Sequence, residues 1–440
     1  MKSVFLLGVG LLFCGLTASS AEVASSSESI SLSMPPASSA EEAEAVSDFS
    51  LRGGADGTPS LAVSSANDPL LQPAVSDSMQ TDSASSWYRK GWIGKVYKYF
   101  SESNEDKTLT RKFDYSIIGG PHYSSDTELG IGLIAAGLYR LDREDLTLPP
   151  SNVTLFGDFS TSGFYMLGIR GNNFFKGGRF RIDYTTYFYS MPSDFWGVGY
   201  YNGRDSAEAR MDRQQMKFKV DLMYRFAKSW YVGFNANYNF TRGKHITRMD
   251  YVPAGQDTKY INTGVGLFLQ HDSRDIVTNP YSGWYLKIDQ AFYPEWLGNR
   301  DGLFTRTELT ADYYTQLAEG SVLAADLHGM FHTGDVPWTM LCLMGGGSRM
   351  RGYYDGRYRD KNLIEGQVEL RQHVYKRFGA AFWVGAAQIF PEFSAMRWSH
   401  ILPNYGLGLR WEFKNRVNIR VDYGFGRDTS GLVFNINEAF

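Results

Sequence analysis

Apolar and polar side chains alternate with a period of two residues through most of this 440-residue chain, from Phe113 to Phe440. In one stretch, charged residues alternate with the apolar residues Phe218, Val220, Leu222, Tyr224 and Phe226. The same pattern occupies 179–188, 232–240 and 417–423. Because successive side chains of a strand point to opposite faces, each stretch predicts a strand with one apolar and one polar face. Such strands suit a barrel with lipid outside and water inside.

The composition agrees with an all-β, antiparallel transmembrane β-barrel and argues against other classes. The mean hydropathy of -0.31 excludes a polytopic helical membrane protein, whose spans each need about 20 apolar residues. Aromatic residues make up 15% of the chain, as expected for aromatic girdles at the membrane interfaces. A soluble β-sandwich is the alternative, although its strands would be shorter and its surface less aromatic. Lys+Arg (44) and Asp+Glu (47) nearly balance, which argues against a nucleic-acid binder.

Three segments precede the alternating region. Residues 1–21 predict a secretory signal peptide, with Lys2 before a short apolar run and small residues before the cleavage point; a retained helix is the alternative. Residues 22–86, rich in Ser, Ala, Asp and Glu, predict a disordered linker. Residues 87–112 predict a short amphipathic helix and lead-in that lies on a membrane face, plugs a barrel mouth or packs on the folded domain. Of the two cysteines, Cys14 falls in the signal, so no internal disulfide is expected with Cys342.

Residues 113–440 divide into about sixteen predicted strands, an even number as bacterial barrels require. The first is expected over 113–120 and the last over 431–440. Connections after even-numbered strands are mostly short, whereas the longest ones, 191–210, 241–259, 333–363 and 389–403, follow odd-numbered strands. Short periplasmic turns and long outer loops produce this division, with both chain ends in the periplasm.

The longest predicted loop contains a glycine run followed by Arg351, Gly352 and Tyr353. Glycines allow the backbone to turn tightly, and the arginine can then enter a crowded lumen. The next predicted strand places Glu369 and Arg371 on its charged face, together with Glu365, Gln367 and His373. Arg351 is therefore expected to pair with Glu369 and to hold the loop inside the barrel.

At these residues the chain resembles the BamA/TamA superfamily of outer-membrane barrels, also called the bacterial surface antigen family. An Arg-Gly-Tyr step in a lumen loop is a hallmark of that family. Arg274 and Asp275, followed by Pro280 and Gly283, resemble its turn motif before a strand. The strand with Glu369 resembles the one that supplies the acidic partner, and 405–411 with 419–424 resembles the last-but-one hairpin. The resemblance covers about 113–440.

The resemblance implies a cell outer-membrane protein that helps other outer-membrane proteins insert or cross the membrane through a seam between the first and last strands. It implies outer-membrane lipid, client outer-membrane proteins and periplasmic or lipoprotein subunits as partners, and no cofactor, metal or catalytic residue. The C-terminal strand with Phe434, Ile436 and Phe440 resembles the signal by which such barrels are themselves assembled. A passive porin or structural surface antigen without insertase activity is the alternative.

Two departures from the family pattern change the expectations. An aromatic-x-Asp-x-Gly step usually follows on the next strand, but 382–387 lacks that aspartate. The Arg351 contact is therefore expected to be weaker or to use another acid, with Asp422 and Glu412 as competing lumen acids. Residues 22–112 lack the apolar pattern of a polypeptide-transport-associated domain, so the chain resembles a barrel-only member in which direct capture of client chains is unsupported.

Enzymatic interpretations find little support. The chain has no Gly-x-Ser-x-Gly elbow, no phosphate-binding glycine loop and no His-Glu-x-x-His motif. His328 and His332 are four residues apart, which on a strand separates them by about 13 Å, too far to share a metal. Cys342 has no activating histidine beside it in sequence and is expected to be an inert thiol. We therefore expect no enzymatic activity.

The composition of the linker yields a first prediction. Residues 22–86 contain one aromatic residue, Phe49, and one positive side chain, Arg52, so they cannot bury enough apolar surface to order themselves. Limited proteolysis of the protein in membranes should remove 22–86 and leave 113–440 intact, as judged by mass spectrometry. A protected fragment from 22–86 would instead reveal a folded domain there.

Overall fold

The computed structural model describes residues 112–124, 128–145, 148, 150–300, 302–414 and 416–440. The signal peptide and the linker expected over 1–86 lie outside these residues, as does the amphipathic helix expected over 87–112 apart from its last residue. Within the described part, no helix is long and apolar enough to cross a membrane.

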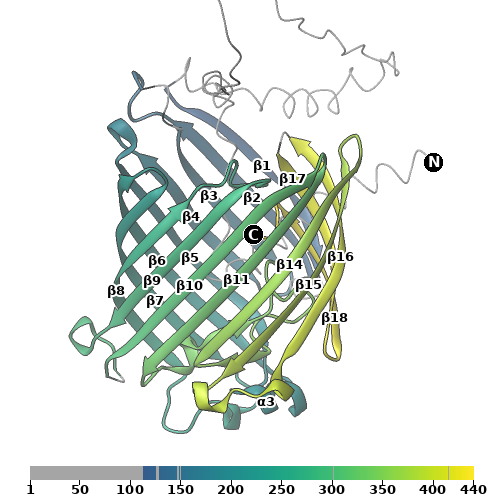
Figure 1. Ribbon diagram of the computed structural model, residues 1–440. Helices are drawn as coiled ribbons and strands as arrows, with labels where there is room; N and C mark the ends of the chain where they lie inside the picture. Colours follow the sequence, from purple (N-terminus) through teal and green to yellow (C-terminus); the bar gives the residue numbers. More distant parts are fainter. Residues whose placement is uncertain (1–111, 125–127, 146–147, 149, 301, 415) are drawn as a thin grey trace, which may run out of the picture. The chain divides into compact units, whose positions relative to one another are not determined.

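One antiparallel sheet of sixteen strands dominates the described residues and curves round into a barrel (Figure 1). Each strand pairs with its neighbour along the chain, except that β11 pairs with β14. The strands are β1 (Asp114–Ser124), β2 (Glu128–Tyr139), β3 (Ser151–Ser160), β4 (Tyr165–Phe174), β5 (Phe180–Phe195), β6 (Ala209–Ala227), β7 (Trp230–Lys244), β8 (Lys259–Asp272), β9 (Gly283–Tyr293), β10 (Phe304–Ala318), β11 (Ser321–Gly334), β14 (Asn362–Tyr375), β15 (Phe378–Phe390), β16 (Leu402–Lys414), β17 (Val417–Gly426) and β18 (Thr429–Ile436). The predicted sixteen-strand antiparallel barrel is confirmed.

The remaining elements lie in the connections. They are the helix α3 (Tyr200–Asp205), the short strands β12 (Cys342–Met344) and β13 (Tyr358–Asp360), and the 3-10 helices η2 (Lys176–Gly178), η3 (Met249–Tyr251), η4 (Glu295–Leu297), η5 (Trp338–Met340), η6 (Phe393–Ala395) and η7 (Trp398–His400). β12 and β13 pair with each other inside the long connection between β11 and β14.

The period-two pattern separates the two faces of the sheet. Along β15, Phe382 is 54% exposed and Val384 is 64% exposed, whereas Trp383 between them is 2% exposed. On β14, Val368 is likewise exposed and Glu369 is fully buried. The outer wall is therefore apolar and the lumen carries the charged residues, which is the arrangement of a barrel in lipid.

The connections differ between the two ends of the barrel. One end, the turn end, has two-residue turns such as 228–229 and 376–377, and Ser229 and Lys376 adopt positive φ angles there. The other end, the loop end, carries 196–208, 245–258, 294–303, 335–361 and 391–401. Some segments depart from the expected division, because 140–150 and 273–282 are long at the turn end, whereas 161–164 and 427–428 are short at the loop end.

The loop 335–361 packs inside the barrel rather than projecting from it. Trp338 and Leu341 join a buried apolar cluster with Phe304 and Tyr293, which point inward from β10 and β9. Met344, Met350 and Tyr353 join a second cluster with Leu363, Ile389 and Leu402. Buried apolar side chains of the loop therefore fill the lumen towards the loop end.

The first and last strands differ from the predicted boundaries. β1 continues past Pro121 to Ser124, which an edge strand tolerates because proline only removes a donor that the edge does not use. β18 ends at Ile436 rather than at 440, and Asn437 with a φ of 69° turns the chain out of the strand. Between the strand residues 114–124 and 429–436, all described, no ladder joins β1 to β18.

A barrel of this kind predicts a characteristic behaviour on gels. The unheated protein in detergent should migrate faster than the boiled protein, because the hydrogen-bonded sheet stays compact until heat separates its strands. Semi-native gel electrophoresis measures the shift, with circular dichroism of the same sample as the control. A predominantly helical spectrum from the folded sample would contradict the fold.

Candidate functional site: an arginine cluster inside the barrel

The backbone around Arg351 lies against the last hairpin. Gly352 has a φ of 100°, and a Cβ atom added there would stand 2.4 Å from the carbonyl oxygen of Gly424 on β17. A Cβ atom added to Gly424 would stand 2.0 Å from the carbonyl oxygen of Arg351. Neither position has room for a side chain, so two glycines let the loop touch the strand and fix the place of Arg351.

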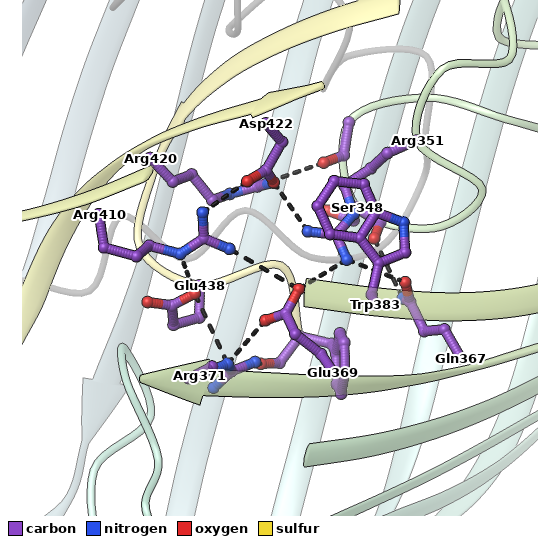
Figure 2. A network of polar contacts seen from close by, with 12 residues as sticks. Ser348, Arg351, Gln367, Glu369, Arg371, Trp383, Arg410, Arg420, Asp422 and Glu438 are labelled. Atoms are coloured by element: carbon purple, nitrogen blue, oxygen red, sulfur yellow. Dashed lines mark hydrogen bonds and ion pairs between the residues drawn. The ribbon is translucent and has the colours of Figure 1, made fainter. Parts of the chain in front are cut away.

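Arg351 is fully buried and contacts two carboxylates. Its Nη2 donates to Glu369 Oε2 at 2.6 Å, and its Nη1 donates to Asp422 Oδ2 at 2.7 Å (Figure 2). The guanidinium also lies over the Trp383 ring, 3.6 Å from its centroid. The expected contact with Glu369 is present, and Asp422 is the additional acid. Glu412 is not, because it accepts the backbone N–H of Arg416 in the turn after β16.

Arg351 belongs to a larger group of buried charges, which we call the lumen cluster. Asp422 also accepts from Arg410 and Arg420, both at 2.5 Å. Glu369 also accepts from Arg371 at 2.8 Å. The cluster comprises Arg351, Arg371, Arg410, Arg420, Glu369, Asp422 and Glu438 (Figure 2). It therefore links the loop to β14, β16, β17 and the C-terminal tail.

Glu438 brings the chain's end into this cluster. Its carboxylate accepts from Arg410 at 2.8 Å and from the Asn418 side chain at 2.6 Å. Phe440 lies beyond β18, with its carbonyl oxygen accepting from Arg371 at 3.0 Å and its ring 6.2 Å from that of Tyr314. The strand expected over 431–440 is thus shorter, because its last four residues fold into the lumen and bind arginines there.

The other two residues of the expected C-terminal signal remain in the strand. Phe434 pairs with Val421 and Ile436 pairs with Ile419 across the β17–β18 hairpin. Phe440, in contrast, is separated from them by the turn at Asn437. The three residues therefore do not share one strand face.

Tyr353 fastens the loop to the loop end of the last strands. Its hydroxyl donates to the Pro403 carbonyl at 2.8 Å and accepts the Arg427 backbone N–H at 2.6 Å. Burial raises the pKa of Tyr353 to about 12, so the hydroxyl stays protonated and keeps donating at neutral pH. Arg351 and Tyr353 together hold the loop at two heights along β16 and β17.

The predicted turn motif reaches the same region from the turn end. Asp275 accepts the backbone N–H groups of Ile276 and Tyr281 and the Arg416 guanidinium, the last at 2.5 Å. Arg416 also lies 3.3 Å from the centroid of the Tyr281 ring. The segment 273–282 therefore extends from the β8–β9 connection to the turn between β16 and β17.

The other motif residues shape that segment. Arg274 makes two hydrogen bonds to Asp272, at 2.8 and 2.9 Å. Pro280 is buried, and Gly283 has a φ of 110° with the Ser273 carbonyl 2.3 Å from the place of a Cβ atom. The Thr278 carbonyl accepts the backbone N–H of Glu438 at 3.2 Å, so the turn motif touches the lumen cluster.

Several members of the cluster and contacts of Arg351 were not singled out from sequence. The family pattern has its aspartate two residues before a glycine. Trp383 occupies that position before Gly385, and Arg351 contacts its ring face where a carboxylate was expected. Arg410 and Arg420 lie on the inward phase of β16 and β17, a signal that the sequence alternation already contained. Asn404, whose amide donates to the Arg351 carbonyl at 2.5 Å, follows the same phase.

The histidines and the cysteine make ordinary polar contacts elsewhere in the lumen. His328 lies between Glu365 and Glu308, at 2.9 and 3.1 Å. His332 contacts the Lys361 carbonyl and lies 3.4 Å from the Cys342 sulfur. Among the described residues, no three His, Cys, Asp or Glu side chains are arranged to hold a metal ion.

Comparison with known proteins agrees with this geometry. Residues 170–440, more than half of the chain, match the model of the Omp85 superfamily domain. The chain belongs to the Omp85 superfamily. It is accordingly an outer-membrane β-barrel, and the expected membership of this group is confirmed. A search of curated proteins finds no match.

Solved structures show the same fold at low identity. CdiB from Escherichia coli has a TM-score of 0.52 and 12% identity, and the match covers 74% of this chain and 62% of CdiB. BamA from Haemophilus ducreyi lacking POTRA domains 1-3 has a TM-score of 0.49 and 11% identity, with 74% and 68% covered. The match thus leaves more than a third of the CdiB chain uncovered, and the likeness to CdiB shows the fold alone.

Because several arginines share each carboxylate, loss of Asp422 should destabilise the barrel more than loss of Arg351. Asp422→Asn should lower the free energy of unfolding by about 3–5 kcal/mol, because it leaves the buried guanidiniums of Arg351, Arg410 and Arg420 without their common anion. Arg351→Ala should lower it less, since Glu369 and Asp422 keep other arginine partners, but should expose 335–361 to protease. Urea titration followed on unheated gels, with limited proteolysis, measures both effects.

The surface pair Arg300–Asp257, 2.6 Å apart and largely exposed, provides the control for this comparison. Arg300→Ala should leave stability and loop protection unchanged, since exposed pairs contribute little. Equal effects of Asp422→Asn and Arg300→Ala would contradict a structural role of the cluster.

Proposed function

We propose that this outer-membrane barrel assists the insertion or translocation of client polypeptides through the junction of β1 and β18, which we call the seam. The observation that carries the proposal is the missing ladder between the described residues of β1 and β18, whereas every other neighbouring pair of the sheet is hydrogen-bonded. Unpaired backbone groups of an edge strand can template another strand by edge pairing. The proposal assigns no catalytic residue and no cofactor.

The lengths of the edge strands support this role. β18 has eight residues and pairs only with β17, while its tail leaves the wall at Asn437. β1 has eleven residues and pairs only with β2. A client strand entering the seam would gain backbone hydrogen bonds, each contributing about 1 kcal/mol net, without breaking a ladder first.

The loop and the tail inside the lumen support a seam rather than a central pore as the route. Loop 335–361 packs inside the barrel, and the C-terminal tail occupies the lumen near Arg371 and Tyr314. A passive porin needs an open aqueous channel. The conductance of the purified barrel in a planar bilayer should therefore be small, and a large, steady conductance would favour the porin.

The lumen cluster fixes β17, which is the strand next to β18 at the seam. Asp422 on β17 is held by Arg351 of the loop, so the loop keeps β17 in place, while β18, which pairs only with β17 among the described strands, is the strand left to move. In this proposal the turn end faces the periplasm, where subunits or clients would approach. Client outer-membrane proteins are the partners that the proposal implies.

A disulfide across the seam tests the mechanism. Ile117→Cys with Leu432→Cys places two thiols on outward-facing positions of β1 and β18, and further pairs can be drawn from 114–119 and 432–436. Oxidation should link the strands and abolish client assembly, measured by insertion of a porin-type client into vesicles that contain the purified protein. Reduction should restore it, because only the opening of the seam has been blocked.

The matched control is the double variant Leu432→Cys with Tyr423→Cys. Tyr423 pairs with Leu432 within the β17–β18 hairpin. That disulfide leaves the seam free, so activity should persist under oxidising conditions. Full activity of the protein with the seam disulfide would show that the seam does not need to open. That result would favour the passive porin or structural surface antigen.

A further inference from the structure

The segment 391–401, which joins β15 to β16, lies on the outer wall of the barrel. The Phe393 ring packs 5.4 Å from Phe331 and 5.2 Å from Phe390, measured between centroids. Phe331 shares the outward phase of exposed Leu327 on β11, and Phe390 shares the outward phase of exposed Val384 on β15. Asn362 of β14 stands between them in register. The segment therefore covers an outward-facing row of three neighbouring strands.

Two polar side chains on this wall depend on the segment. Asn362 donates to the Phe390 and Pro391 carbonyls, at 3.2 and 2.9 Å. Gln388, on the outward phase of β15, donates to the Arg397 carbonyl at 2.5 Å. Both side chains are buried although they face away from the lumen. A bare amide facing lipid is unfavourable, so these contacts fix the segment on the wall.

The position along β15 places the segment at the edge of the membrane. Apolar side chains, exposed except for half-buried Ala380, follow the outward phase of β15 from Phe378 to Ala386, and Gln388 is the first polar residue after them. The ten steps from Phe378 to Gln388 extend about 33 Å along a strand. With the usual strand tilt this is about 25 Å of height, the thickness of the apolar band of such barrels. Gln388 thus marks the boundary at the loop end.

At this boundary the segment exposes aromatic and basic side chains. Trp398 is 91% exposed and Phe393 is 63% exposed, and Met396 and Arg397 between them are also exposed. The backbone that carries them is held in place, because Arg427 donates to the Ser399 and Ile401 carbonyls and His400 stacks on Tyr200 of α3 at 4.1 Å. The exposure of Trp398 is therefore built into the fold.

Arginine side chains surround the C-terminal half of the segment. Partial desolvation, followed by the charges of Arg397, Arg204 and Arg427, lowers the pKa of His400. The acid within the segment, Glu392, accepts the Ser394 hydroxyl at 3.3 Å. An exposed arginine beside a tryptophan at a membrane boundary matches a lipid headgroup, where the ring sits at headgroup level and the guanidinium binds phosphate.

We propose that residues 391–401 form a lipid anchor in which Trp398, Phe393 and Met396 enter the headgroup region and Arg397 binds the phosphate of an anionic lipid. The outer wall continues directly into this surface, which is why lipid is the occupant rather than a soluble protein. The proposal rests on the barrel being in a membrane and does not depend on the seam or on client insertion.

Fluorescence quenching in vesicles tests the insertion of Trp398. The full chain and its Trp398→Leu variant are reconstituted in phosphatidylcholine carrying bromine at shallow or deep acyl positions. The difference between the two proteins isolates Trp398, and shallow bromines should quench it more than deep ones. Absent quenching would place Trp398 in water and leave the surface for a soluble partner, and equal or stronger quenching by deep bromines would place it in the hydrocarbon; either result would overturn the anchor.

Lipid selectivity tests the role of Arg397. Brominated phosphatidylglycerol should quench Trp398 with an apparent affinity about fivefold above that of brominated phosphatidylcholine, as one cation near a membrane surface provides. Arg397→Gln should bring the ratio close to one, whereas Arg210→Gln, at an exposed arginine on β6, should not change it. An unchanged ratio in Arg397→Gln would overturn the phosphate contact.

Inorganic phosphate added to the same vesicles separates lipid from a free anion. It should leave the selectivity ratio unchanged, and loss of selectivity at millimolar phosphate would assign Arg397 to soluble anions instead. Heat-dependent gel mobility of each variant verifies that the barrel is folded before quenching is read.

Discussion

The sharing of three buried carboxylates among four buried guanidiniums is the interaction on which the arrangement around the last strands depends. Asp422 accepts from three arginines, and Glu369 and Glu438 each lie within 3.6 Å of at least two. A buried charge without a partner is strongly unfavourable, so no element that carries one of these groups can leave without disturbing the others. The loop, β14, β16, β17 and the tail therefore behave as one connected body.

This connection holds the last strands in place although no ladder joins the described residues of β1 and β18. Loop 335–361 is fixed at Arg351 by charge and at Tyr353 by hydrogen bonds to the Pro403 carbonyl and the Arg427 backbone. The turn segment 273–282 adds a third link through Arg416 and Asp275. Contacts across the lumen thus hold the last strands of the sheet in place without a ladder between β1 and β18.

Much of this fold was accessible from the sequence, and the reason is the two-residue period. Strand number, sheet order and the inward phase follow from the alternation, and the pairing of Arg351 with Glu369 follows from family resemblance. The other members of the lumen cluster could not be predicted, because the sequence shows that Arg410 and Arg420 point inward but not how high in the barrel they lie. The sequence also did not identify Trp383 as a partner of Arg351, because an aromatic ring takes the place of the expected carboxylate.

The end of β18 shows a second limit of strand patterns. Residues 431–436 alternate, but Glu438 falls on the apolar phase of Leu432, and the ladder stops at Ile436, where the next residue adopts a φ of 69°. Staying in the wall would have left Glu438 away from the arginines and Arg371 without the Phe440 carbonyl. Local propensity favours the strand, whereas three-dimensional charge pairing favours the inward turn. Because that pairing draws the tail away from the wall, the same arginines that stabilise the lumen also shorten the strand at the seam.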